Sequence, residues 1–171
     1  MERPGDITFQ GNPLTAIGPC LKAGDKAPDF ELLANDLSPV KLSDSAGKIL
    51  LLISVPSLDT PVCDMETRKF NEQLDGMGGG VVGYTISADL PFAQARWCGA
   101  AGVKAMQTLS DHREMAFGTA YGVNIKELRL DARAVFVVDA AGALRYVEYV
   151  KEITNQPDYA AALAAIQDLL K

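Results

Sequence analysis

The chain holds three cysteines, and one of them lies where a helix is expected to begin. Cys63 follows Thr60 and Pro61; Thr is a favoured N-cap residue, and Pro is favoured at the first helical position. Cys63 would then be the third helical residue, beside unpaired backbone N–H groups at the positive end of the helix dipole. That setting favours the thiolate, which is the nucleophilic form of cysteine. The spacing therefore predicts a reactive cysteine.

A strand and a helix must position this cysteine. Residues 50–55 form a short apolar run, typical of a strand buried on both faces of a sheet, and Pro56 should end the strand. The helix should then run over residues 61–74, with Asp64 and Arg68 as an exposed pair one turn apart. The pattern thus predicts a strand, a tight turn and a helix that begins at the thiol.

The segment 56–63, PSLDTPVC, resembles the active-site loop of the peroxiredoxins, whose pattern is Pro-x-x-x-Thr/Ser-x-x-Cys. Pro56, Thr60 and Cys63 fill the three specified places. The fuller form, SLDTPVC, is similar to the bacterial thiol peroxidase branch of that family. The similarity extends from about Ile7 to the C-terminus and implies a thioredoxin-like fold.

The resemblance implies that Cys63 attacks the O–O bond of a hydroperoxide and becomes a sulfenic acid. Thr60 can cap the helix, but its hydroxyl can also donate to the thiolate or to a peroxide oxygen, and the family implies this second role. Arg133, in DARAVFVVD, matches a family arginine that holds the thiolate and polarises the peroxide. Pro56, Thr60 and Arg133 are accordingly the expected substrate-binding residues.

Cys98, in ARWCGAAG, matches the family's resolving cysteine, and the resemblance implies an intrachain Cys63–Cys98 disulfide. From the residues alone, Cys98 could equally be a helix-packing cysteine beside Trp97. Because both cysteines would lie on helices, we expect the short helix ending at Gly99 to unwind before the bond closes. The family implies thioredoxin as the reductant, a homodimer, and no haem, metal or flavin.

Three other functions can be set against this one. A thioredoxin-like disulfide reductase is disfavoured because the chain has no Cys-x-x-Cys pair. A peroxide-sensing redox switch could use the same cysteines. A Cys–His hydrolase would have to use His112, the only histidine, but a His beside Asp111 at a helix start is more typical of a surface or capping residue. Cys20 is interpreted as a non-catalytic thiol in a loop.

Three apolar residues near the predicted site could line a slot for alkyl hydroperoxides: Leu58, Val62 and Phe92. Each of them taken singly is more typical of a core residue, and the core interpretation is preferred.

The composition of the chain argues against several other classes of protein. The chain has 171 residues, 48% of them hydrophobic and 22% charged, as expected for one soluble domain over residues 1–171. A net charge of −6 argues against general nucleic-acid binding. No apolar run approaches the roughly 20 residues of a membrane span, and the first residues lack the apolar core of a signal peptide, so a cytoplasmic location is expected. One histidine and no close cysteine pair argue against a zinc site.

The other segments alternate between β and α patterns, which predicts an α/β protein with a mixed central sheet flanked by helices. Asp89 should cap a helix over residues 90–98 that stops at Gly99, and Asp111 should begin a second helix, with Glu114 as its capping-box partner, that ends at Gly122. The remaining expectations are an N-terminal hairpin at 7–17 turning at Gly11-Asn12, strands near 30–33, 40–42, 81–87, 133–139 and 143–150, and a last helix that begins at Pro157 and carries Tyr159, Leu163, Ile166 and Leu170 on one face.

Overall fold

The computed structural model describes residues 1–171, and its centre is a seven-stranded sheet of order β11-β10-β5-β6-β7-β3-β4. Strands β5, β6 and β7 are parallel to one another. Strand β10 is antiparallel to both β5 and β11, and strand β3 is antiparallel to both β7 and β4. This confirms the predicted mixed sheet. The strands are β3 (Glu31–Leu33), β4 (Pro39–Lys41), β5 (Ile49–Ser54), β6 (Val81–Ser87), β7 (Met106–Ser110), β10 (Ala134–Val138) and β11 (Leu144–Tyr149).

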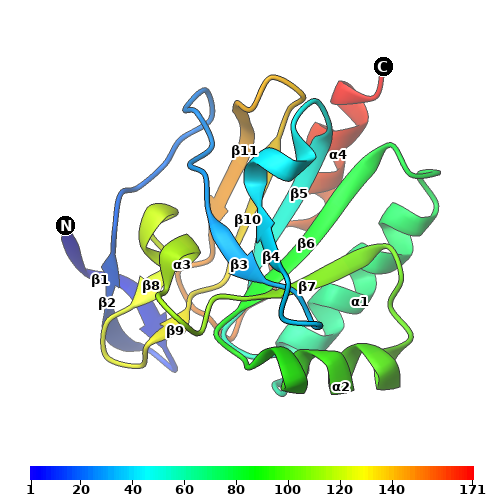
Figure 1. Ribbon diagram of the computed structural model, residues 1–171. Helices are drawn as coiled ribbons and strands as arrows, with labels where there is room; N and C mark the ends of the chain where they lie inside the picture. The colour runs from blue at the N-terminus through cyan, green and yellow to red at the C-terminus, as the bar shows by residue number, and fades with distance from the viewer.

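A second, four-stranded sheet has the order β1-β2-β8-β9. The predicted hairpin is confirmed as β1 (Glu2–Phe9) and β2 (Asn12–Ile17), although β1 begins earlier than expected. Strands β8 (Asn124–Ile125) and β9 (Leu130–Asp131) were not predicted, because two-residue strands carry too little pattern to be recognised. Figure 1 shows this small sheet beside α3, at one side of the central sheet.

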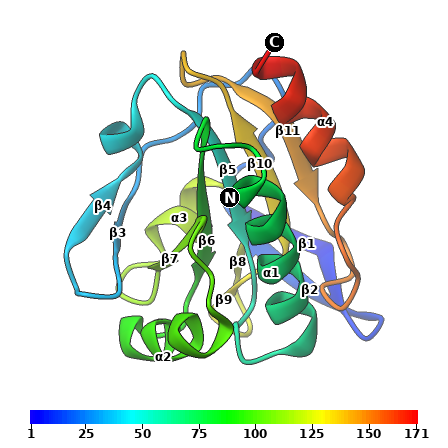
Figure 2. The ribbon, with the colours of Figure 1, turned by 90° about the vertical axis from the view of Figure 1, so that its right-hand side faces the viewer.

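Helices cover the two faces of the central sheet (Figures 1 and 2). Helices α1 and α4 pack on one face, and α3 lies on the other, while α2 packs beside β7. None of the helices combines the length and the apolar sequence that a membrane span needs. The helices are a 3₁₀ turn (Leu42–Ser45), α1 (Pro61–Asp75), α2 (Pro91–Ala101), α3 (Ala116–Ala120) and α4 (Tyr159–Leu169).

Strand β5 separates two hydrophobic cores. Its alternate residues Leu50 and Leu52 belong to the core on the α3 side, and Leu51 and Ile53 belong to the core under α1 and α4. All four side chains are buried, as the continuous apolar run predicts for a strand covered on both faces.

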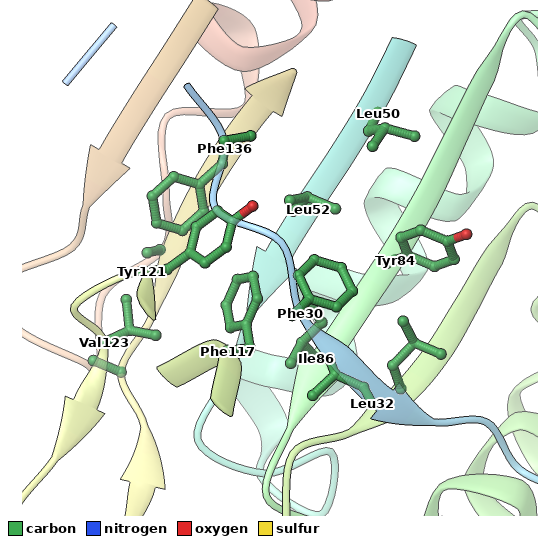
Figure 3. Close-up of a cluster of buried hydrophobic side chains, with 14 of the residues drawn as sticks. Phe30, Leu32, Leu50, Leu52, Tyr84, Ile86, Phe117, Tyr121, Val123 and Phe136 are labelled. Atoms are coloured by element: carbon green, nitrogen blue, oxygen red, sulfur yellow. The ribbon is translucent and has the colours of Figure 1, made fainter. Parts of the chain in front are cut away.

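An aromatic cluster fills the core on the α3 side, as Figure 3 shows. The rings of Phe117 and Tyr121 are stacked with centroids 4.2 Å apart, and Phe136 meets Tyr121 edge-on at 5.1 Å. The buried Tyr121 hydroxyl donates to the Pro28 carbonyl at 2.8 Å. These contacts fix α3 against the sheet although α3 has only five residues.

Helix α2 begins where it was predicted, at Pro91, but its predicted cap and its predicted end were wrong. The N-cap is Leu90, and the carboxylate of Asp89 binds a neighbouring loop instead of the helix. The helix continues past Gly99 to Ala101, and its C-cap is Gly102, whose φ of 67° is left-handed. Gly99 lies within the helix, so the glycine that stops α2 is the one in the left-handed conformation.

The prediction of a helix beginning at Asp111 with Glu114 as capping partner was also wrong. Helix α3 begins at Ala116, and Glu114 is exposed in the preceding turn. The Asp111 carboxylate instead accepts from the Phe117 and Gly118 backbone N–H groups at 3.1 and 2.7 Å. Asp111 thus satisfies backbone N–H groups in the first turn of α3, although it precedes that helix by several residues.

The last helix begins close to where it was predicted, with the Asp158 side chain accepting from the Ala161 N–H at 3.0 Å. Its buried residues are Ala162 and Ile166, whereas Leu170 is 43% exposed. Leu170 therefore does not belong to the predicted apolar face, because α4 ends at Leu169.

Candidate active site

The strand pairing of β5 with β10 brings Cys63 and Arg133 together. These strands are antiparallel, and Ser54 at the end of β5 lies opposite Ala134 at the start of β10. The Ser54 hydroxyl also donates to the Ala132 carbonyl at 2.7 Å. Arg133 therefore enters at the edge of the sheet from which the chain leaves β5 toward α1.

Cys63 is the third residue of α1, and Thr60 is the N-cap, as predicted. The thiol has no exposed surface. Two side-chain donors point at its sulfur: Thr60 Oγ1 lies 2.7 Å from Sγ, and Arg133 Nη2 lies 3.2 Å from it. The hydrogen-bond donors on the sulfur are therefore side chains rather than the backbone N–H groups of the helix start.

The Thr60 hydroxyl makes no capping bond to the helix. Its two acceptors are the Cys63 sulfur and the Ser57 carbonyl, the latter at 2.8 Å. Because a hydroxyl has one proton, Thr60 donates to one of them at a time. A rotation of the hydroxyl can thus redirect its hydrogen bond from the loop carbonyl to the sulfur with little movement of the side chain.

Arg133 is buried and is held on three sides. Its Nε and Nη2 atoms donate to the Ile153 carbonyl at 3.1 and 3.0 Å, and its Nη1 atom pairs with the Glu66 carboxylate. Burial alone would lower the pKa of Arg133, but Glu66 and then the Cys63 sulfur raise it. The guanidinium therefore stays charged between a carboxylate and the sulfur.

Glu66 lies wholly inside the protein, one helical turn after Cys63. One carboxylate oxygen pairs with Arg133, and the other has no hydrogen-bond partner. Burial raises the pKa of Glu66 to about 7, against the opposing effect of Arg133. Sequence reasoning missed this residue. The available signal was that a carboxylate shares the apolar face of α1 with Phe70 and Leu74.

The loop that carries Thr60 is anchored by Asp89. The Asp89 carboxylate accepts from Ser57 Oγ at 2.7 Å, from the Leu58 N–H at 2.8 Å and from Ser87 Oγ at 2.8 Å. These bonds join the turn after β5 to the end of β6. They explain why Asp89 is not available as the cap of α2.

The other predicted neighbours of the thiol divide into buried and exposed residues. Pro56 is buried where β5 ends, Leu58 is buried in one small cluster with Val55 and Cys63, and Val62 is half-buried. Phe92 is 67% exposed, so its preferred interpretation as a core residue was wrong. The first turn of α2 turns this ring outward.

Cys98 does not contact Cys63. Its half-buried sulfur lies 3.3 Å from the Thr108 hydroxyl on β7, and all three cysteines are free thiols. Cys20 is exposed, and no hydrogen bond joins it to the group around Cys63. His112 is half-buried in the turn after β7, away from the contacts of Cys63. No group of three or more His, Cys, Asp and Glu side chains is arranged to bind a metal ion.

A pair of buried carboxyl groups, Asp111 and Asp131, lies where β7 and β9 end. Asp131 has no exposed surface, and Asp111 is 2% exposed. Burial, and then the charge of Asp111, raises the pKa of Asp131 well above its ordinary value. Burial likewise raises the pKa of Asp111 to about 6, although the hydrogen bonds that it accepts from the α3 N–H groups lower this pKa. Burial therefore favours the protonated form of both carboxyl groups, and neither oxygen of Asp131 has a hydrogen-bond partner.

Known proteins resemble this chain over most of its length. The Redoxin family model matches residues 22–163. A thiol peroxidase of Halalkalibacterium halodurans is 58% identical over 164 residues, covering 96% of this chain and 98% of the relative. A thiol peroxidase of Bacillus subtilis is 54% identical over 166 residues, covering 97% and 99%. A peroxiredoxin-like protein of Aquifex aeolicus has a solved structure that superposes with a TM-score of 0.89 at 40% identity, covering 95% of this chain and 96% of that one.

The matched family, the similarity over almost the whole length of these relatives and the thioredoxin-like architecture lead to one conclusion. The chain belongs to the Redoxin family, as a peroxiredoxin-type oxidoreductase of the thiol peroxidase group.

Proposed function

We propose that this protein reduces hydrogen peroxide and organic hydroperoxides, with Cys63 as the attacking sulfur and Cys98 as the resolving one. The observation that carries the proposal is the convergence of Thr60 and Arg133 on the Cys63 sulfur, at 2.7 and 3.2 Å. One donor is neutral and the other is a buried cation. Such an arrangement stabilises a thiolate and leaves donors in place for a peroxide oxygen.

In the first step the Cys63 thiolate attacks one peroxide oxygen. An S–O bond forms, the O–O bond breaks, and the departing oxygen takes a proton to leave as water or an alcohol. Arg133 stabilises the negative charge that develops on the departing oxygen, because its guanidinium offers several donors in a fixed plane. Thr60 can release the sulfur and donate to a peroxide oxygen, since its hydroxyl has two acceptors within reach.

In the second step Cys98 attacks the sulfenic acid of Cys63 and forms an intrachain disulfide with loss of water. Since Cys98 now faces Thr108, α2 must unwind locally before the two sulfurs meet. A dithiol protein such as thioredoxin then reduces the disulfide and returns both thiols. The protein needs no metal or organic cofactor for this cycle, and we expect it to act as a homodimer.

Non-reducing peptide mapping tests the assignment of the two cysteines. The fully reduced protein is treated with one equivalent of hydrogen peroxide and digested, and the linked peptides are identified by mass spectrometry. A Cys63–Cys98 link within one chain, absent in the Cys63→Ser variant, is expected. A stable sulfenic acid on Cys63 with Cys98 still free would remove the resolving role, and an unmodified Cys63 would refute the proposal as a whole.

A peroxide-sensing switch is the second candidate, because disulfide formation must rearrange α2 and would change the protein surface. Sustained turnover separates the two functions. Many cycles of peroxide reduction per chain, with thioredoxin and its reductase present, are expected of the enzyme. A single turnover that leaves the disulfide in place would favour the switch.

A further inference from the structure

Helix α2 is held against α1 by contacts that centre on Trp97, the only tryptophan in the chain. The indole Nε1 atom donates to Asp64 Oδ1 at 2.8 Å. The Arg68 guanidinium lies over the indole ring, with Cζ 5.7 Å from the centroid, and Arg68 Nη1 donates to the Ala101 carbonyl at 3.2 Å. Asp64 and Arg68 also pair with each other at 3.0 Å. We refer to Asp64, Arg68 and Trp97 as the α2 latch.

The latch places Trp97 where Cys98 would have to go. The indole packs against the small apolar cluster that contains Cys63. The sulfur of Cys98, the next residue, faces the Thr108 hydroxyl, which itself donates to Asn35 Oδ1 at 2.8 Å. Successive side chains of a helix point about 100° apart. While α2 is intact, Trp97 therefore faces Cys63, and Cys98 faces β7.

The two halves of α2 are held by different kinds of contact, a buried amide in one and half-exposed side chains in the other. In the N-terminal half, the buried Gln94 amide donates to Ser87 Oγ at 3.0 Å and to the Leu109 carbonyl at 2.9 Å. In the C-terminal half, Gly99 and Ala100 are exposed, and a glycine within a helix costs about 1 kcal/mol relative to alanine. Apart from the bond of Cys98 to Thr108, the latch supplies the side-chain bonds that hold this half. Opening is therefore expected to begin at the C-terminal turn.

We propose that the α2 latch sets the rate at which the Cys63–Cys98 disulfide forms, with Trp97 as a positioning residue for that step; this inference rests on the proposed function. Release of the indole from Asp64 and Arg68 frees the C-terminal turn of α2 and lets Cys98 take its place. In the bond-forming step the Cys98 thiol loses its proton, the S–S bond forms, the S–O bond of the sulfenic acid breaks, and water leaves.

The latch consequently determines how long the sulfenic acid survives. While it survives, a second hydroperoxide can transfer an oxygen to it, giving a sulfinic acid on Cys63 and an alcohol or water. A tight latch prolongs exposure to this reaction, and a loose latch shortens it. The latch thus sets the sensitivity of the protein to inactivation by excess peroxide.

Replacement of two arginines by alanine provides a matched test. Arg68→Ala removes the contacts with Asp64, Trp97 and Ala101, whereas Arg96→Ala removes an exposed guanidinium of α2 that makes no hydrogen bond or ion pair. Both variants keep Trp97, so its fluorescence reports the movement of α2. Rapid acid quenching and mass spectrometry after mixing with hydrogen peroxide count the sulfenic acid and the disulfide separately.

We expect Arg68→Ala to form the disulfide from the sulfenic acid roughly two- to tenfold faster than Arg96→Ala, as the loss of about one hydrogen bond implies. It should also accumulate less sulfinic acid at high peroxide. Equal resolution rates in the two variants, with normal oxidation of Cys63, would overturn the latch and leave the proposed function intact. If Cys63 of the unaltered protein formed no sulfenic acid, both would be overturned.

A second variant keeps the test decisive if Arg68→Ala does not fold. Trp97→Phe removes the indole donor to Asp64 but keeps an aromatic ring against the Cys63 cluster. Its disulfide should also form faster than that of Arg96→Ala, as followed by mass spectrometry. An unchanged or slower resolution step in Trp97→Phe would contradict the latch.

Discussion

Replacement of Arg133 by methionine should impair both folding and peroxide chemistry, and a second substitution should separate the two effects. Methionine fills much of the volume but removes the donor that lies 3.2 Å from the Cys63 sulfur. It also leaves the Glu66 carboxylate buried without its ion-pair partner. Breaking a buried pair in this way costs about 3–5 kcal/mol of folding stability. Loss of a hydrogen bond to a charged group, worth about 1.5–3 kcal/mol, should slow oxidation of Cys63 roughly 10- to 150-fold.

Adding Glu66→Leu to Arg133→Met removes the unpaired carboxylate. Because a buried ion pair can be replaced by apolar residues at little net cost, most of the lost stability should return. The Ile153 carbonyl still lacks its donors, so recovery should be incomplete. The rate of Cys63 oxidation should stay low, since the sulfur still lacks the charged donor.

Two assays on the reduced proteins give the two quantities. Urea unfolding measures the free energy of unfolding, and single-turnover oxidation by hydrogen peroxide measures the rate constant of Cys63. Arg145→Met is the matched control, because Arg145 is 55% exposed and its buried partner Asp139 keeps the hydrogen bonds that it accepts from the Ala141 and Ala143 N–H groups. A double variant that recovered the rate together with the stability would refute a direct role of Arg133 at the sulfur.

Three further changes follow from the same contacts. Thr60→Val should slow Cys63 oxidation about tenfold in the single-turnover assay through loss of the 2.7 Å bond, while Thr60→Ser should keep most of the rate; equal rates would contradict donation by the hydroxyl. Since burial raises the pKa of Asp131 in the folded state, its ionisation costs stability as pH rises above about 4. Asp131→Asn should therefore raise the free energy of unfolding more at pH 8 than at pH 4 in urea titrations, and an equal change at both pH values would contradict this. Asp89→Ala removes three hydrogen bonds to a carboxylate and should cost about 2–3 kcal/mol, with faster hydrogen exchange of the Leu58 amide; an amide still fully protected would show that other contacts hold the loop.

The elements around the thiol could be predicted because their signals are local. The apolar run of β5 and the Thr60-Pro61 pair lie within a few residues of the positions they determine, and α1 begins where they indicate. Predictions failed where a residue of helix-cap type binds a segment other than the helix that directly follows it. Asp89 and Asp111 have the residue type of a helix cap, but the tertiary structure uses the first for the Ser57 loop and the second for a helix that begins later.

That a cysteine begins a helix directly after a buried strand could be inferred from the residues of that segment, because strand and helix formation depend on neighbouring residues. What surrounds the cysteine depends on the tertiary structure. Arg133 meets Cys63 across 70 positions because β10 runs antiparallel beside β5, and Glu66 becomes an internal carboxylate only when α1 packs on the sheet. The direction of Cys98, toward Thr108 and away from Cys63, likewise depends on how α2 packs beside β7. Contacts of this kind follow from strand register and from burial, which no short stretch of sequence contains.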